Sequence, residues 1–228
     1  MKKTISLLLA LALALSSSAA LAAGKLTVNQ ETYVPIDSYG LKSYLFAELE
    51  NTGDKNIEYG DGLLEILTED GDPMDSDSIY SMYPEVLAPG EKGYLYTTAY
   101  VSDAEKLEDI SDYTLTVTGK STKEEAPTRL ESTAEYTTIT NKWGDEEAVV
   151  RLTLVNKTEE TVYDGQAVFG LYDAEGRLLL VNSNAAYNIG IPAGQSLEML
   201  FPIDSDLLKV WEQEKLVPTS VECIAYME

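Results

Sequence analysis

The 228-residue sequence contains no histidine and a single cysteine. Histidine is the most frequent general base in enzymes, so the commonest route to acid–base catalysis is closed, and a Cys–His nucleophile pair is impossible. The lone Cys223 cannot form an intramolecular disulfide, so packing alone must hold the fold. Cys223 alternates with Val221 and Ala225, which predicts a small core side chain rather than a reactive thiol.

The sequence also lacks the short motifs of common catalytic and metal sites. It has no G-x-S-x-G nucleophile elbow, no glycine-rich phosphate loop and no zinc-ligand spacing. Paired carboxylates could in principle hydrolyse a glycosidic bond, but among 39 acidic residues some pair satisfies any spacing rule. We therefore predict that the protein is not an enzyme and needs no cofactor.

Positive charge is scarce, with 16 Lys and Arg against 39 Asp and Glu and a formal net charge of −23. This sign repels phosphate backbones and anionic lipid headgroups, which argues against nucleic acid and bare membrane as partners. The acids are interspersed among hydrophobic residues that make up 44% of the chain, so the charge indicates a solvated face on a folded protein rather than disorder.

Long hydrophobic runs are confined to the N-terminus. Lys2 and Lys3 precede an apolar run at 5–15, and small residues end at Ala22, the pattern of a cleaved secretory signal. The run is shorter than the roughly 20 residues that span a bilayer. We predict a signal peptide at 1–22 and an extracytoplasmic product, secreted or periplasmic and not inserted in a membrane. Cleavage removes two lysines and no acids, so the charge becomes −25.

Three turn markers recur in the same order in the two halves of the chain. Asn51 and Asn156 are 105 residues apart, Gly71 and Gly176 are 105 apart, and Gly90 and Gly194 are 104 apart. Each marker is flanked by runs rich in β-forming residues with partial alternation. Such a spacing predicts a duplicated unit.

Each half ends with a short helical pattern followed by an alternating strand. In the first half Ser102 and Glu105 have capping-box spacing. In the second half either Asp204 or Ser205 can serve as N-cap. Trp211 follows at helical spacing and is expected to cap the core.

The predicted fold class is all-β, with two tandem immunoglobulin-like antiparallel β-sandwich domains that each carry a short helical turn before the last strand. We place the domains at 26–119 and 133–228. A polar linker with one proline joins them at 120–132. Trp143 and the Asn156-Lys157-Thr158 segment are expected in turns of the second domain.

Residues 169–173 read Phe-Gly-Leu-Tyr-Asp, the F-x-L-Y-D signature. Over most of 133–228 the chain resembles the FxLYD domain family, which implies a bacterial exported protein with an immunoglobulin-like sandwich and no established enzymatic role. The first half reads Leu-Glu-Ile-Leu-Thr at 64–68 and looks like a diverged copy. Phe169 and Leu171 are expected to fill the core, and Asp173 to accept amide hydrogen bonds in the turn toward Gly176.

Tyrosine is the unusual residue of the first half. Exposed tyrosines suit protein or sugar contacts, so Tyr80, Tyr83, Tyr94 and Tyr96 are candidate binding residues. Aligning Gly90 with Gly194 makes Tyr94 and Tyr96 point outward, whereas a one-residue slip places both in the core.

The densest acidic cluster, at 69–77, offers a weak metal candidate in Asp70, Asp72, Asp75 and Asp77. Calcium prefers such oxygen ligands. The cluster nevertheless lacks the Gly and Glu that an EF-hand requires at its sixth and twelfth positions. A solvated hairpin tip is the favoured interpretation, and no metal site is expected.

The preferred function is binding, adhesion or envelope scaffolding by a secreted non-enzymatic protein, with an unknown protein or glycan as partner. The alternative is a calcium-dependent structural protein that uses the acidic loop at 69–77. A carboxylate-dependent glycan hydrolase is the third choice.

Overall fold

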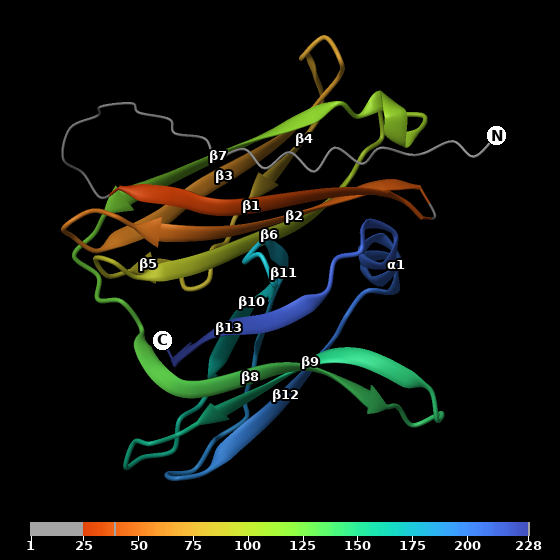
Figure 1. The fold of residues 1–228 in the computed structure, drawn as a ribbon. Helices are drawn as coiled ribbons and strands as arrows, with labels where there is room; N and C mark the ends of the chain where they lie inside the picture. Colours follow the sequence, from red (N-terminus) through yellow and green to blue (C-terminus); the bar gives the residue numbers. More distant parts are fainter. Residues whose placement is uncertain (1–24, 39, 228) are drawn as a thin grey trace.

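A computed structural model describes residues 25–38 and 40–227, so the predicted signal peptide lies outside the described residues (Figure 1). Antiparallel strands dominate these residues, which confirms the prediction of an all-β fold. Within the described ranges, no helix has the length and apolar character needed to cross a membrane.

The first half of the chain forms two facing sheets. One has the order β1-β2-β6, with β1 at Leu26–Asp37, β2 at Leu41–Asn51 and β6 at Lys92–Tyr100. In the other, β3 (Ile57–Leu67) pairs with β4 (Pro73–Ile79), β5 (Val86–Leu87) and β7 (Asp112–Ser121). Between the sheets lies a core of buried apolar side chains that includes Leu45, Leu95, Ile57, Leu64 and Ile66.

The second half repeats this pairing. Strands β8 (Thr128–Thr140), β9 (Glu146–Val155) and β12 (Ser196–Pro202) correspond to β1, β2 and β6. Strands β10 (Gln166–Asp173), β11 (Leu178–Ala185) and β13 (Pro218–Met227) correspond to β3, β4 and β7. At one corner β13 also pairs with β8, which joins the two sheets into one. The predicted linker therefore overlaps both neighbouring strands, and only 122–127 lie outside strands.

The turn markers of the sequence occupy equivalent places in the two halves. The Asn51 side chain donates to the carbonyl of Leu87 at 2.9 Å, and the Asn156 side chain donates to the carbonyl of Ile191 at 2.7 Å. Both asparagines are fully buried. Gly71 and Gly176 close their hairpins with φ of 80° and 77°, the positive values that glycine adopts without a steric penalty.

The signature residues 169–173 shape the second half as expected. Phe169 and Leu171 are fully buried, and the Phe169 ring meets Phe201 of the opposite sheet edge-on at 5.0 Å. Asp173 accepts hydrogen bonds from the amides of Glu175 and Arg177 at 3.0 and 2.9 Å. These observations confirm the predicted packing and turn roles.

The helical segments before the last strands differ in their caps. Helix α1 (Ser205–Glu214) begins after Asp204, which accepts a 2.9 Å hydrogen bond from the Asp206 amide and is the N-cap. In the first half a 3₁₀ turn, η1 (Leu107–Asp109), has Lys106 as its N-cap. The predicted Ser102–Glu105 capping box is wrong, because the Asp75 carboxylate on β4 accepts hydrogen bonds from both the amide and the hydroxyl of Ser102.

Both tryptophans lie where the sequence places them. Trp211 of α1 is buried against the core of the second half. Trp143 is exposed in the turn between β8 and β9, with the Lys142 ammonium 4.3 Å from its ring centroid.

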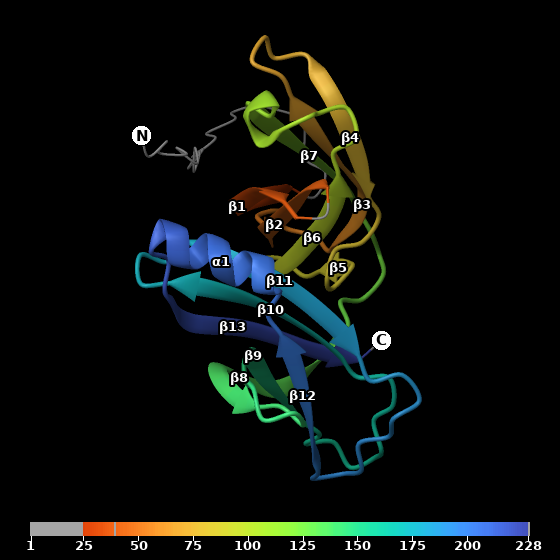
Figure 2. The same cartoon turned by 90° about the vertical axis from the view of Figure 1, so that its right-hand side faces the viewer.

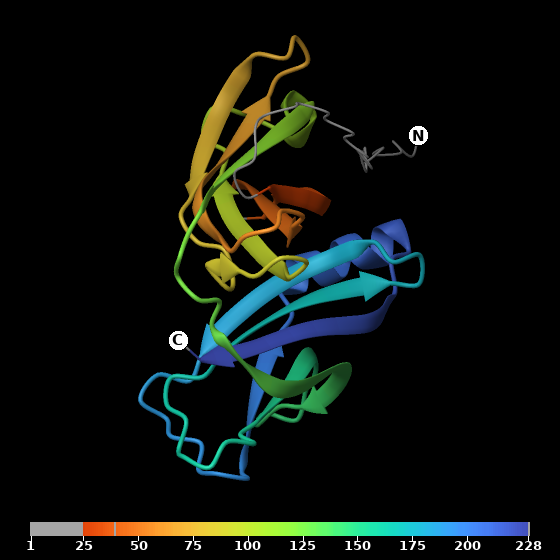
Figure 3. The same ribbon diagram turned by 90° about the vertical axis from the view of Figure 1, so that its left-hand side faces the viewer.

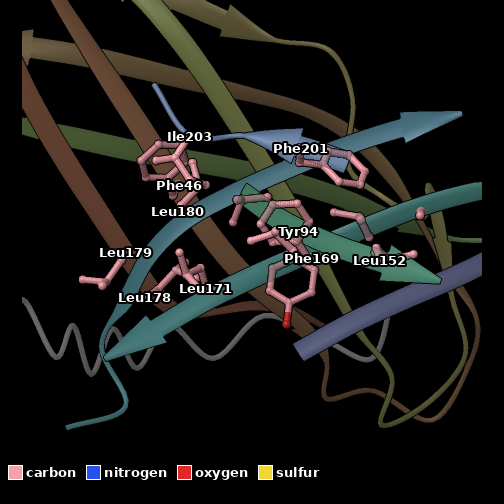
Figure 4. Packing of buried hydrophobic residues seen from close by; sticks show 14 of the residues in the cluster. Phe46, Tyr94, Leu152, Phe169, Leu171, Leu178, Leu179, Leu180, Phe201 and Ile203 are labelled. Atoms are coloured by element: carbon pink, nitrogen blue, oxygen red, sulfur yellow. The ribbon is translucent and has the colours of Figure 1, made fainter. Parts of the chain in front are cut away.

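The strands form four stacked layers in the order β4-β3-β7, β1-β2-β6, β11-β10-β13 and β8-β9-β12, and the last two layers are the two parts of the six-stranded sheet (Figure 1). The two middle sheets face each other, so β2 and β10 are buried on both faces. Because both faces are apolar, these strands alternate only partly in sequence. Figure 4 shows the result: Phe46 and Tyr94 of the first half share one cluster with Phe169, Leu171 and Leu180 of the second half.

Candidate functional site

Tyr94 and Tyr96 point away from the core of their own half, as the alignment of Gly90 with Gly194 predicts. The second half covers them. Tyr94 is 1% exposed, and its hydroxyl lies 3.0 Å from the hydroxyl of Tyr172. Tyr96 is half-buried and its hydroxyl lies 3.2 Å from Ser183 Oγ. The prediction that Tyr94 contacts an external partner is wrong, because its face belongs to the interface between the halves.

The other two candidate tyrosines do not complete a patch. Tyr83 is half-buried and stacks on Tyr96 with ring centroids 6.0 Å apart. Tyr80 is 81% exposed. Of the four tyrosines predicted as binding residues, Tyr83, Tyr94 and Tyr96 therefore lie at or beside the interface between the halves, and Tyr80 is exposed by itself.

A buried polar network lies at the centre of this interface. The Tyr172 hydroxyl donates to Glu48 Oε2 at 2.5 Å, and Lys92 Nζ lies 3.1 Å from Glu48 Oε1. Burial raises the pKa of the Tyr172 and Tyr94 phenols far above the ordinary tyrosine value. Glu48 is buried and has a partner on each carboxylate oxygen, so its contacts favour one register of the two halves.

A second polar contact ties β2 to the start of α1. Lys42 Nζ lies 3.3 Å from Asp206 Oδ2, and the Tyr44 hydroxyl donates to Asp204 Oδ2 at 2.5 Å. Hydrogen bonds from Lys209 and Ser38, with a further contribution from Lys42, lower the pKa of Asp206 to about 2.

Cys223 lies at the edge of the same interface, in a shallow open cleft that also contains Lys92, Arg129 and Glu222. The thiol is half-buried, and its sulfur is 3.4 Å from Ser132 Oγ. Burial raises the pKa of the Cys223 thiol, which favours the unreactive protonated form.

The acidic cluster does not converge on one point. Asp70 and Asp72 are exposed in the β3–β4 turn, whereas Asp75 and Asp77 belong to strand β4. Asp77 accepts a 2.6 Å hydrogen bond from the Thr97 hydroxyl. In the part of the chain that the structure describes, no group of three or more acidic, Cys or His side chains is placed to hold a metal ion. The hairpin turn is shorter than the predicted 69–77, because strand β4 already begins at Pro73.

A different exposed surface was not predicted from the sequence. Two loops, 156–165 after β9 and 186–195 after β11, extend together from the end of the second half away from α1 (Figures 2 and 3). They present Tyr163, which is 62% exposed, Tyr187, which is 73% exposed, and the exposed side chain of Ile189. We call these three residues the aromatic loop patch.

Buried and backbone contacts hold the two loops together. The Asn156 amide group donates to the carbonyls of Glu160 and Ile191, both at 2.7 Å, and so links one loop to the other. The backbone N–H of Asn188 donates to Asp164 Oδ1 at 2.7 Å. Asp164 and Asn188 have φ of 52° and 58°, a left-handed conformation that costs free energy in residues other than glycine.

The Tyr163 ring is fixed by its neighbours. A β-carbon at Gly190 would lie 2.8 Å from Tyr163 Cε1, so the ring rests directly on the backbone of the opposite loop. Tyr163 is therefore a preorganised exposed ring suited to noncovalent contact, and the exposed Tyr187 and Ile189 lie on the loop that supports it. A sequence signal existed, because both tyrosines lie in Asp, Asn and Gly segments, but periodicity alone does not distinguish such loops from plain turns.

Comparisons with known proteins leave the family open. A search against models of protein families finds no match, and a search of curated proteins finds none either. Among solved structures, the crystal structure of red sea bream transglutaminase aligns with a TM-score of 0.25 and 13% identity, covering 81% of this chain and 28% of that chain. A score this low carries no argument, so the resemblance of 169–173 to the FxLYD family stays a prediction.

Proposed function

We propose that this chain is an exported, non-enzymatic binding or scaffolding module, built from two immunoglobulin-like sandwiches, that acts at or beyond the bacterial envelope. The secretory pattern at 1–22, the FGLYD resemblance and the repeated pairing of sheets support this proposal. In such a module the stacked sheets provide a stiff body and the loops at its end provide recognition.

The aromatic loop patch is the observation that carries the proposal. Tyr163 and Tyr187 leave most of their ring surface in solvent although their loops are tied down by the buried Asn156. Exposed tyrosines on loops positioned by a rigid scaffold are the usual composition of a recognition surface, because they offer apolar area and a hydroxyl at a low cost in conformational entropy.

The surroundings of the carboxylates also support a binding role. Glu48 is enclosed between Tyr172 and Lys92, and Asp173 is engaged by backbone amides and by Arg177. These acids satisfy structural hydrogen bonds, which favours binding over hydrolysis.

The test is saturable binding of the purified mature chain to isolated cell envelopes of the source organism. A variant with Tyr163→Ser, Tyr187→Ser and Ile189→Ser is expected to bind at least about tenfold more weakly. The matched control replaces Tyr80 and Tyr100, two exposed rings of the first half, with serine and should bind normally. Absence of saturable binding, equal loss in the control, or turnover of envelope polysaccharides by the chain would each contradict the proposal.

A further inference from the structure

We infer that the aromatic loop patch docks a cationic protein segment, an extended stretch of a partner that carries Arg or Lys. This inference rests on the proposed function, since it assigns a partner class to the same surface. The internal repeat supplies the argument, because the same end of the first half has an occupant within this chain.

In the first half the connecting segment is hydrogen-bonded to this end. Asn51, the counterpart of Asn156, donates to the carbonyls of Lys55 and Leu87 in the two loops of its own half. The connection then runs along these loops. The Asn56 side chain donates to the carbonyl of Glu124 at 2.8 Å, and the Thr122 amide donates to the carbonyl of Asn56 at 3.0 Å.

A cation completes this internal docking. Arg129, just beyond the connecting segment, contacts both carboxylate oxygens of Glu91, at 3.2 Å through Nε and at 3.1 Å through a terminal nitrogen. Such a two-point guanidinium–carboxylate contact combines charge with fixed geometry. The first end is thus contacted by the extended segment 122–127 and by an arginine at the start of β8, the strand that follows it.

The equivalent positions of the second half are uncovered. The spacing of 104 residues that relates Leu87 to Ile191 also relates Tyr83 to Tyr187. Tyr83 is half-buried by its stacking on Tyr96, whereas Tyr187 is 73% exposed. Tyr163, Tyr187 and Ile189 at the second end are all exposed, so the described residues leave these three side chains open to a partner.

The acidic residues around the patch favour a positively charged partner. The two loops carry the exposed acids Glu159, Glu160 and Asp164 and one cation, Lys157, which pairs with Glu131 at 3.7 Å. Tyrosine faces attract ammonium and guanidinium groups, and nearby carboxylates add to that attraction. A net charge of −23 before signal cleavage steers cationic partners toward the chain and repels anionic ones.

The experiment titrates the full mature chain with three probes: a short arginine-rich peptide, the same peptide with glutamate at each arginine, and a neutral hexasaccharide of N-acetylglucosamine. We expect binding of the arginine peptide alone. Tyr163→Ser with Tyr187→Ser should weaken that binding about tenfold, as loss of central aromatic contacts commonly does. Glu159→Gln with Glu160→Gln should weaken it several-fold and reduce its dependence on salt.

Matched controls separate a specific site from general charge attraction. Glu105→Gln with Glu108→Gln makes the same charge change on exposed acids of the first half, and Tyr80→Ser with Tyr100→Ser removes two exposed rings there. Both controls should bind the peptide normally. Equal weakening in the controls, or no peptide binding at all, overturns the inference.

The saccharide probe separates failure of the cationic-partner inference from failure of the proposed binding function. If the hexasaccharide binds through Tyr163 and Tyr187 while the arginine peptide does not, the cationic partner is overturned and the proposed binding function stands. If envelope binding is also absent, both fail.

Discussion

The Tyr172 hydroxyl donates a 2.5 Å hydrogen bond to the carboxylate of Glu48, 124 residues earlier in the chain. The two side chains belong to the two middle sheets, and both are buried. Because a buried carboxylate costs free energy unless its oxygens are satisfied, this contact favours one register of the halves over others.

Tyr172→Phe removes the donor and leaves one oxygen of Glu48 without its partner. We expect the free energy of unfolding to fall by about 1–3 kcal/mol, the usual cost of an unsatisfied buried acceptor. Urea denaturation followed by circular dichroism measures this loss. Tyr80→Phe, at an exposed ring, is the control and should change stability by less than about 0.5 kcal/mol. Equal stabilities of the two variants would contradict the assigned role of the contact.

Alkaline pH should unfold the protein through its buried phenols. Burial raises the pKa of Tyr59, Tyr94 and Tyr172 above the value of about 10 in the unfolded chain. Their contribution to stability is therefore complete below that pH and is lost as the pH rises beyond it. We expect part of the tyrosinate absorbance to appear in one step, together with loss of the β-sheet circular dichroism signal. A gradual titration of every tyrosine in a still-folded protein would refute this.

Acid should weaken the contact between β2 and α1. The pKa of Asp206 is lowered to about 2, chiefly by Lys209, then by Ser38 and Lys42. An acid with a lowered folded pKa contributes stability above its unfolded pKa of about 4, and this contribution is lost as the pH falls toward 2. Asp206→Asn should therefore flatten the dependence of the melting temperature on pH between about 4 and 2. Asp70→Asn, in the exposed hairpin turn, is the control and should leave the slope between these pH values unchanged.

The two equivalent asparagines offer a matched pair of variants. Asn156→Ala and Asn51→Ala each remove two hydrogen bonds to backbone carbonyls, one buried and one partly buried, together with the bonds that the side-chain oxygen accepts, and each should cost about 2 kcal/mol of stability. Only Asn156→Ala should also release the loops that carry the aromatic loop patch. Hydrogen exchange should then quicken at the amides of Val162 and Ile191, which bond each other's carbonyls across the two loops. Unchanged exchange there would show that Asn156 does not hold the loops.

Local signals in the sequence predicted the positions that depend on nearby chain. Asn51 and Asn156, the turn toward Gly176, and the N-cap at Asp204 all lie where turn and cap chemistry places them. The turn toward Gly176 and the N-cap at Asp204 are set by hydrogen bonds to residues a few positions away. Asn51 and Asn156 also bond the near ends of their own turns, and each adds a bond to a second loop, 36 and 35 residues away. The Ser102 prediction failed because its hydrogen bonds are not local: Ser102 donates to the carboxylate of Asp75, on strand β4.

The missed features depend on contact between the halves. Periodicity shows which face of β6 carries Tyr94, but it does not show that a second sheet lies over that face. The clue was the apolar character of both faces of β2 around Phe46, which indicates a strand covered on each side. Tyr83 and Tyr187 occupy equivalent positions but differ in exposure, because Tyr83 stacks on Tyr96 and Tyr187 is 73% exposed. The sequence pattern at these positions does not show this difference.

The stacking of the middle sheets has a consequence for the export that we propose. Translocated alone, the first half would display Val34, Ile36, Phe46 and Tyr94 to water, since the sheet of the second half is what shields them. An uncovered apolar sheet of this kind invites insolubility and degradation. If the chain is exported as proposed, we therefore expect a stable product only once both halves have crossed the membrane, and we expect fragments that contain one half to aggregate.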